Sequence, residues 1–153
     1  MGAVEDRLAA AGLTVPEVVP PVAVYQPAVQ SGSLVFTSGQ LPMRDGRLLA
    51  TGTVGADVDL EAAQAAAAQC ALNAVAAVRG LIGDLDRVVR VVKAVCFVAS
   101  APGFTGQPAV ANGASTLLGT AFGEAGVHAR SAVGVSALPL GAPVEVEVIV
   151  EVR

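Results

Sequence analysis

The chain carries one arginine whose neighbours along a predicted strand are all small. Arg130 lies within A-R-S-A-V-G-V-S-A at 129–137, a pattern that predicts a β-strand. Alternation along this strand places three small residues on the face of the arginine: Ala132, Gly134 and Ser136. We therefore expect room for a ligand beside the guanidinium, which can bind a carboxylate through two parallel hydrogen bonds. An arginine paired with a strand glutamate fits the same pattern equally well.

The end of the chain supplies a carboxylate for the same chemistry. V-E-V-E-V-I-V-E-V-R at 144–153 alternates strictly, which predicts a strand with five valines on one face and glutamates on the other. A solvated strand face accounts for two of these glutamates, Glu147 and Glu151. If this strand and 131–137 form a hairpin, Glu145 lies beside Ser136, about 20 Å along the strand from Arg130. No small substrate spans that gap, so a site that uses both residues must be assembled between subunits.

The elements that position these residues follow from the periodicity of the apolar side chains. The sequence predicts a short helix at 3–11, strands at 22–30, 34–37, 87–99, 129–137 and 144–153, a loop at 38–47 with a turn at Asp45-Gly46, and helices at 59–82 and 107–125. Asp57 or Asp59 can cap the long helix, and its Gln69 and Asn73 lie off the apolar face. The order β-β-α-β-α-β-β indicates a single α+β domain over 1–153, with one mixed sheet and two helices packed on one face.

Composition excludes several classes of function. The net charge of −4 and the 3% of aromatic residues argue against a nucleic-acid-binding protein. The chain lacks a phosphate-binding loop, a dinucleotide fingerprint and a nucleophile elbow, and its single histidine cannot build a multi-histidine metal site. Cys70 and Cys96 read as buried thiols. The first residues of the chain do not have the pattern of a signal peptide. The polar residues within 60–78 argue against a membrane-spanning helix, so we expect a cytoplasmic protein. The 54% of apolar residues suggests a subunit interface.

Three phrases resemble one known family. V-F-T-S-G-Q-L-P at 35–42, A-R-S-A-V at 129–133, and L-P followed by V-E-V-E within 138–147 occur in the order and spacing of the reactive intermediate deaminase family, also called Rid, YjgF or L-PSP-type. The resemblance covers residues 20–153, and 1–19 looks like the N-terminal extension of a divergent subgroup. It implies a chorismate-mutase-like fold and a homotrimer with three clefts between subunits. It also implies hydrolysis of enamines and imines without a cofactor.

The resemblance also assigns roles to individual residues. Arg130 matches the arginine that binds the substrate carboxylate, and Glu145 matches the glutamate that orients or activates water across the subunit interface. Tyr25 matches the tyrosine that lines the cleft. Ser38 and Gly39 match the small residues at the end of the second strand, whose backbone approaches the ligand.

Three further positions adjust this assignment. Asn112 corresponds to an asparagine of the second helix, with the spacing displaced by one residue. Ala132 stands where many members carry cysteine; imine hydrolysis needs no thiol nucleophile, so we expect a changed pocket shape and substrate preference. His128 replaces the usual proline and reads as a loop histidine, or as a pocket-edge histidine that titrates near neutral pH.

The expected reaction is hydrolytic deamination of 2-aminoacrylate-type intermediates to 2-keto acids and ammonia. The alternative is a catalytically silent module that binds a small carboxylate, such as a 2-imino or 2-keto acid, on the same trimeric fold. Some relatives are labelled ribonucleases or translation inhibitors, but the acidic charge and scarce aromatics weigh against a nucleic-acid partner. No metal, other cofactor or membrane is expected.

Overall fold

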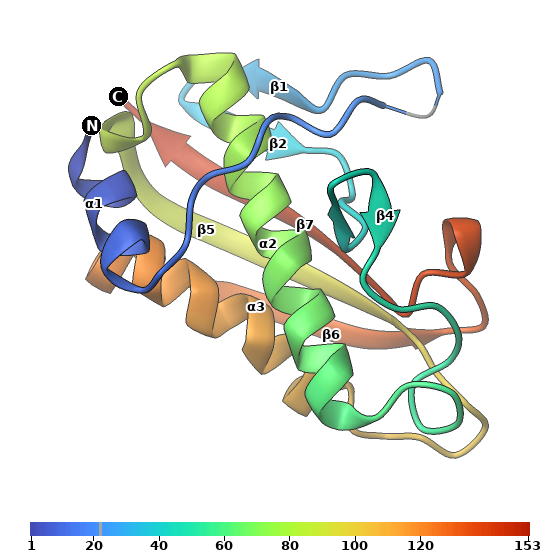
Figure 1. The fold of residues 1–153 in the computed structure, drawn as a ribbon. Coiled ribbons are helices and arrows are strands. Elements are labelled where there is room, and N and C mark those ends of the chain that lie inside the picture. Colours follow the sequence, from blue (N-terminus) through green and yellow to red (C-terminus); the bar gives the residue numbers. More distant parts are fainter. Residues whose placement is uncertain (22) are drawn as a thin grey trace.

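A five-stranded mixed sheet forms one layer of the computed structural model, which describes residues 1–21 and 23–153 (Figure 1). Its strands are β1 (Ala28–Ser31), β2 (Leu34–Thr37), β5 (Val88–Ala99), β6 (Ala129–Val135) and β7 (Val144–Val152). They lie in the order β1-β2-β7-β5-β6. The β5–β6 pair is parallel, and the other pairs are antiparallel.

Two helices cover one face of this sheet. They are α2 (Leu60–Ile82) and α3 (Gln107–Phe122), and both lie in front of the strands in Figure 1. Asp59 caps α2, since its carboxylate accepts a hydrogen bond of 2.8 Å from the backbone N–H of Ala62. The two helices approach closely at Gly113, where a Cβ would overlap the backbone of Gln64. The predicted order β-β-α-β-α-β-β of the main strands and helices, and the single mixed sheet, are thus confirmed.

Shorter elements complete the chain. They are α1 (Ala3–Ala10), the two-residue strands β3 (Met43–Arg44) and β4 (Arg47–Leu48), and the 3₁₀ turns η1 (Leu85–Arg87), η2 (Gly123–Gly126) and η3 (Pro139–Gly141). The α1 helix joins the core through Val4 and Leu8, which are buried. Its first backbone N–H groups donate to the carboxylate of Asp86, beside the C-terminal end of the chain.

The core lies between the helices and the facing side of the sheet. All five alternate valines of β7 are buried there, as their spacing predicted, and are at most 4% exposed: Val144, Val146, Val148, Val150 and Val152. By length and composition α2 could cross a membrane, but 67% of its apolar window is buried inside the fold. Burial of that kind is what the central helix of a packed core shows.

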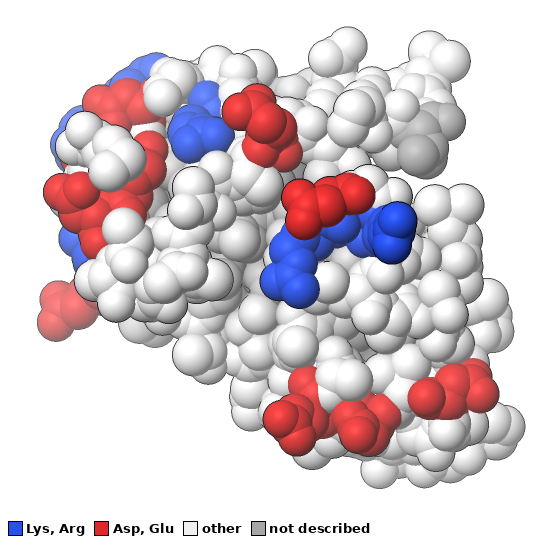
Figure 2. Space-filling model, viewed as in Figure 1, with Lys and Arg blue, Asp and Glu red and all other residues white. Residues whose placement is uncertain are grey.

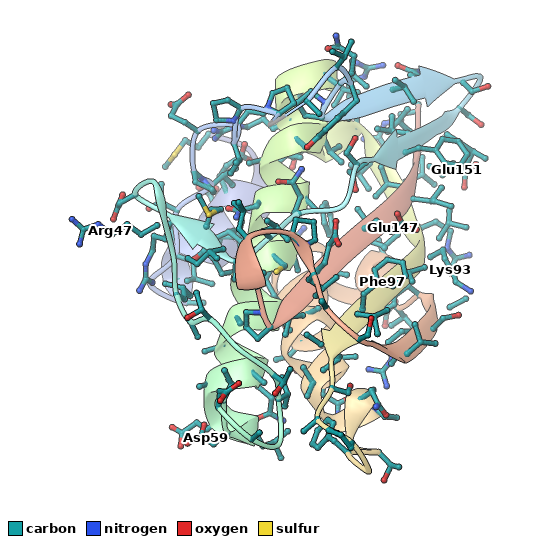
Figure 3. The ribbon with its side chains drawn as sticks, turned by 90° about the vertical axis from the view of Figure 1, so that its right-hand side faces the viewer. Arg47, Asp59, Lys93, Phe97, Glu147 and Glu151 are labelled. Atoms are coloured by element: carbon teal, nitrogen blue, oxygen red, sulfur yellow. The ribbon has the colours of Figure 1, made fainter. Side chains whose placement is uncertain are left out.

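The opposite face of the sheet carries no helix among the described residues. Figure 3 shows Lys93, Phe97, Glu147 and Glu151 on this side, pointing away from α2. The strand registers add Phe36 and Val133, of which 38% and 44% are exposed. We call this surface the open face. It mixes aromatic and aliphatic side chains with charged ones.

Several predicted boundaries were wrong. The strand expected at 22–30 is reduced to β1, because residues 23–25 form bends and Pro27 cannot donate a hydrogen bond to a strand ladder; Val22 lies outside the described residues. The loop predicted at 38–47 contains β3 and the first residue of β4, and the two strands flank the expected turn. The second helix stops at Phe122, and the strand at 129–137 stops at Val135.

Candidate functional site

Arg130 is half-buried on β6, the edge strand, and reaches across to α3. Its Nη1 donates to Oδ1 of Asn112 at 2.9 Å and to Oγ of Ser115 at 3.2 Å. Its Nη2 donates to the carbonyl oxygen of Pro108 at 3.3 Å. Asn112, which the resemblance assigned to the site, therefore contacts Arg130. Among the described residues no carboxylate forms an ion pair with Arg130, so the strand-glutamate alternative is wrong for this subunit.

Two N–H groups of this guanidinium remain available. An arginine has five N–H donors, and three donate to Asn112, Ser115 and Pro108. Within residues 1–21 and 23–153, nothing accepts from Nε or from the second Nη2–H. A guanidinium with open donors and no counter-charge can bind a carboxylate.

The helix side of Arg130 is oriented by a chain of hydrogen bonds. His128 Nδ1 lies 2.6 Å from the carbonyl oxygen of Gly126, which can only accept, so Nδ1 carries the proton. In the neutral ring, Nε2 is then the acceptor for the Ser115 hydroxyl at 2.9 Å. The oxygen of Ser115 in turn accepts from Arg130. His128 thus lies in the loop before β6, as predicted, and also lines the hollow beside Arg130; its ring holds Ser115, which in turn contacts Arg130.

The expected room beside Arg130 is partly filled. A Cβ on Gly134 would lie 2.9 Å from Nε2 of Gln107 and 3.0 Å from Oγ of Ser100, so these polar side chains cover that position. Ala132 is half-buried and packs against the core. The open space lies instead toward the start of β6, in a shallow hollow of about 310 Å³ lined by Ser115, His128 and Arg130 among others.

Glu145 lies on the open face, where it faces Phe97 across the β5–β7 ladder. Its carboxylate packs directly against Gly39, because a Cβ at that glycine would overlap the acid group. Burial, reinforced by the nearby charge of Glu147, raises the pKa of Glu145 above its ordinary value. A carboxyl group with a raised pKa is better suited both to accept and to donate a proton near neutral pH.

The remaining predicted residues gather near Glu145. Ser38 donates to the carbonyl oxygen of Gln26 at 2.5 Å, and its backbone N–H donates to Pro27 at 2.8 Å. These bonds tie the end of β2 to the segment that carries Tyr25, whose side chain is 43% exposed. Gln40 exchanges backbone hydrogen bonds with Val146 at 2.8 and 3.0 Å, which holds Gly39 beside β7.

The structure therefore separates the predicted residues into two groups. Arg130, Asn112 and Ala132 lie on or beside β6, and Tyr25, Ser38, Gly39 and Glu145 lie at the junction of β2 and β7. The hairpin between the last two strands is wrong, since β5 lies between them. Arg130 aligns with Ala94 and Glu145 with Phe97, three residues along β5, so the two Cα atoms are about 14 Å apart.

The two side chains also point to opposite faces of the sheet. Arg130 reaches α3 on the helix side, whereas Glu145 lies on the open face. One subunit cannot place both groups on one small substrate. A site assembled between subunits stays a prediction, and the side of the sheet now supports it as well as the distance.

Some residues at this site were missed by the sequence analysis. Ser115 lies three residues after Asn112, one helical turn along α3, so it shares the face that meets Arg130. That spacing could have identified it. Gln107 gave no signal, because its role depends on how the loop before α3 folds over Ser100 and Gly134.

The site offers little for a metal or a reactive thiol. Burial raises the pKa of Cys96 to about 12 and that of Cys70 well above its usual value, so neither is a thiolate near neutral pH. Within residues 1–21 and 23–153, no group of three or more His, Cys, Asp or Glu side chains could hold a metal ion.

Comparison with known proteins places this geometry in a family. The family model described as "YjgF/chorismate_mutase-like, putative endoribonuclease" matches residues 5–152. "Protein TCP17" from Trypanosoma cruzi is 47% identical over 153 residues, which cover 99% of this chain and 96% of that protein.

Solved structures agree with this match. Protein Atu1372 from Agrobacterium tumefaciens, described as of unknown function, is 48% identical with a TM-score of 0.92 over 98% of this chain and 92% of that chain. A "putative endoribonuclease" from Shewanella oneidensis MR-1 is 34% identical with a TM-score of 0.95, covering 99% and 100% of the two chains. The YjgF gene product of E. coli is 27% identical with a TM-score of 0.62, covering 90% and 94%. The chain belongs to the YjgF/chorismate-mutase-like family.

Proposed function

We propose that this protein hydrolyses reactive enamines and imines of the 2-aminoacrylate type in clefts between subunits of a homotrimer. The observation that carries the proposal is the division of the predicted groups between two surfaces. Arg130 has two open N–H donors on the helix side of an edge strand, and Glu145 has a raised pKa on the open face. In a cyclic assembly each subunit supplies Arg130 to one neighbour and Glu145 to the other.

The open face is suited to such an assembly. Phe36, Phe97 and Val133 are partly exposed on it, and partly exposed aromatic groups favour burial against another copy. Packing a copy there would withdraw Glu145 further from water. Its pKa would then rise again, since burial disfavours the charged form.

The chemistry follows from the two groups. Arg130 binds the substrate carboxylate and so fixes the position of the carbon that bears nitrogen. Protonated Glu145 donates its proton to the terminal carbon of 2-aminoacrylate, which converts the enamine into an imine. As a carboxylate, it then takes a proton from water while the water oxygen bonds to the imine carbon. Glu145 passes this proton to the nitrogen of the resulting adduct, and the C–N bond breaks as the hydroxyl group becomes the keto group and returns its proton to Glu145. Ammonia and a 2-keto acid leave.

The first test follows 2-aminoacrylate generated in the cuvette by a serine or cysteine lyase. We expect the wild-type protein to speed its loss and keto-acid release. Arg130→Ala removes two charge-assisted hydrogen bonds of about 1.5 kcal/mol or more each, so kcat/KM should fall more than about a hundredfold. Arg47→Ala, at an exposed arginine on the β3–β4 hairpin, is the matched control and should be unaffected.

A mixing experiment tests whether the site is shared. Arg130→Ala and Glu145→Gln should each be inactive alone. In randomly mixed trimers, about one quarter of the clefts pair an intact Arg130 with an intact Glu145 from the neighbouring subunit. Recovery toward that fraction of wild-type activity supports a shared cleft. A site within one subunit predicts no recovery.

The same measurements address the alternatives. A silent carboxylate-binding module would bind pyruvate without changing the loss of 2-aminoacrylate. Several relatives are described as endoribonucleases, but this chain has a net charge of −4 and only five aromatic residues (one tyrosine and four phenylalanines) for base stacking. Cleavage of RNA by the pure protein would contradict the proposed reaction class.

A further inference from the structure

A cavity of about 490 Å³ lies on the helix side of the molecule; neither Arg130 nor Glu145 lines it, but Tyr25 and Gly39 of the candidate site do. We call it the hairpin pocket. It is enclosed by the N-terminal segment 16–21, by the segment 39–46 that includes β3, and by the middle of α2. Its volume falls within the range of about 300–1,000 Å³ that is typical of sites for small molecules.

The walls of the hairpin pocket are mainly apolar. They include three prolines of the N-terminal segment, together with Val18, Leu41 and Met43. Proline fixes one backbone dihedral, so a segment with Pro16, Pro20 and Pro21 loses little further entropy when it lines a site. A wall of this kind is suited to bind an apolar molecule without a large ordering penalty.

The floor of the hairpin pocket is polar and buried. Asn73 is 1% exposed, and its Nδ2 donates to the carbonyl oxygens of Leu41 and Met43 at 3.0 and 2.9 Å. Because these two oxygens can only accept, the orientation of the Asn73 amide is determined, and its Oδ1 must be an acceptor. Gln69 supplies the donor, since its Nε2 lies 3.0 Å from this oxygen. The orientation of Gln69 is therefore determined as well.

This arrangement leaves one acceptor open toward the cavity. Gln69 is 7% exposed and lines the pocket, no described residue donates to its Oε1, and this oxygen keeps some accessible surface. An N–H or O–H group of a ligand can therefore take the place of water on this oxygen. The apolar part of the same ligand would fill the walls.

The charges at the mouth of the hairpin pocket oppose one another. Arg44 and Asp45 of the hairpin and Glu17 of the N-terminal segment all line it. Figure 2 shows basic and acidic side chains side by side over the β3–β4 region. No single sign of charge dominates, and the buried group at the floor is uncharged. Both features favour a neutral ligand.

We propose that the hairpin pocket is a second ligand site, which takes an uncharged, mainly apolar molecule that donates an N–H or O–H hydrogen bond to Gln69. The site shares Tyr25 and Gly39 with the candidate deaminase site but uses neither Arg130 nor Glu145. Probe binding that is unchanged in Arg130→Ala would separate this proposal from the deaminase proposal.

Two isosteric probes test the proposal. Cyclohexanecarboxamide has an N–H donor, and acetylcyclohexane replaces its NH₂ by a methyl group. Tyr25 is the single tyrosine of a chain without tryptophan, and it lines the pocket, so its fluorescence reports occupancy without a label. We expect saturable binding of the carboxamide, about three- to tenfold tighter than that of the ketone.

Two variants assign the effect to the pocket. Gln69→Leu should bind both probes equally, because the acceptor is gone. Val19→Phe, in the wall, should weaken both probes more than about tenfold by filling space. If Gln69→Leu fails to fold by circular dichroism, the probe comparison in wild type and Val19→Phe decides. Absence of saturation, equal affinity of the two probes for wild type, or normal binding to Val19→Phe would overturn the proposal. If a second copy of the chain closed the pocket in solution, the probes would show no saturable binding, which is the first of these results.

Discussion

A methyl group at Gly39 would test the position of Glu145 with the smallest change the chain allows. A Cβ at this position would lie 2.8 Å from Cδ and 3.1 Å from Cγ of Glu145, whereas non-bonded carbons prefer about 3.5–4.0 Å. The backbone of Gly39 does not require glycine, since its φ lies outside the left-handed region. Gly39→Ala therefore adds a steric conflict with the acid and little backbone strain.

The size of the effect follows from this overlap. The carboxylate must move by about 1 Å, and a displacement of that size at a catalytic group can lower a rate about a hundredfold. Glu145 is half-buried and can rotate toward water, so the loss of stability should stay below the roughly 1–3 kcal/mol of a fully packed site. The expected result is a large fall in the rate of 2-aminoacrylate hydrolysis with a nearly unchanged urea midpoint.

Thr116→Ala is the control. Thr116 is an exposed residue of α3 and is not part of the hollow beside Arg130. The variant should keep full activity and gain slightly in stability, because alanine favours a helix over threonine. Wild-type kcat/KM in a folded Gly39→Ala protein would refute the argument that Glu145 acts from this position.

Three further outcomes follow from the site. Burial raises the pKa of Glu145 in the folded protein, so the free energy of unfolding should decline as the pH rises from the unfolded-state pKa of about 4.3 through the folded-state pKa. The loss is about 1.4 kcal/mol per unit of difference between the two pKa values. Glu145→Gln should avoid it when urea unfolding is compared at pH 4 and pH 8. Ser115→Ala removes one of three bonds that hold Arg130, so KM for the imine should rise several-fold with kcat little changed, and Ser115→Thr should restore it in steady-state assays. Cys96, whose pKa is raised to about 12 by burial, should resist iodoacetamide at pH 8 by mass spectrometry unless the protein is unfolded.

Local signals in the sequence predicted the elements well. The alternation at 144–153 predicted both β7 and its buried valines, because a strand that covers a core must alternate. Asp59 followed by an apolar periodicity of three and four located the start of α2 to within one residue. Such features depend on neighbours in the chain, which the sequence contains.

Long-range pairing was less predictable. The hairpin between the last two strands failed because nothing local in 129–137 shows that β6 pairs with β5 in parallel. Gln69 and Asn73 were placed off the apolar face of their helix, but both are buried, since the segment 39–46 folds back over them and its carbonyl oxygens need donors. The predicted 22–30 strand failed in a similar way, because edge pairing with β2 decides where β1 begins.

The alternation of side chains along the strands places the two halves of the candidate site on opposite faces of the sheet, and no loop movement can change this. Arg130 aligns with Ala94 and Glu145 with Phe97, an odd offset, so alternation along β5 sends the two side chains to opposite faces. A one-residue slip of β6 would bring Arg130 onto the open face, but it would also remove the arginine from Asn112 and Ser115 and bury Ser131 in place of Ala132. The hydrogen bonds that orient Arg130 thus oppose the slip. In the proposed mechanism, therefore, a second subunit supplies the guanidinium to Glu145.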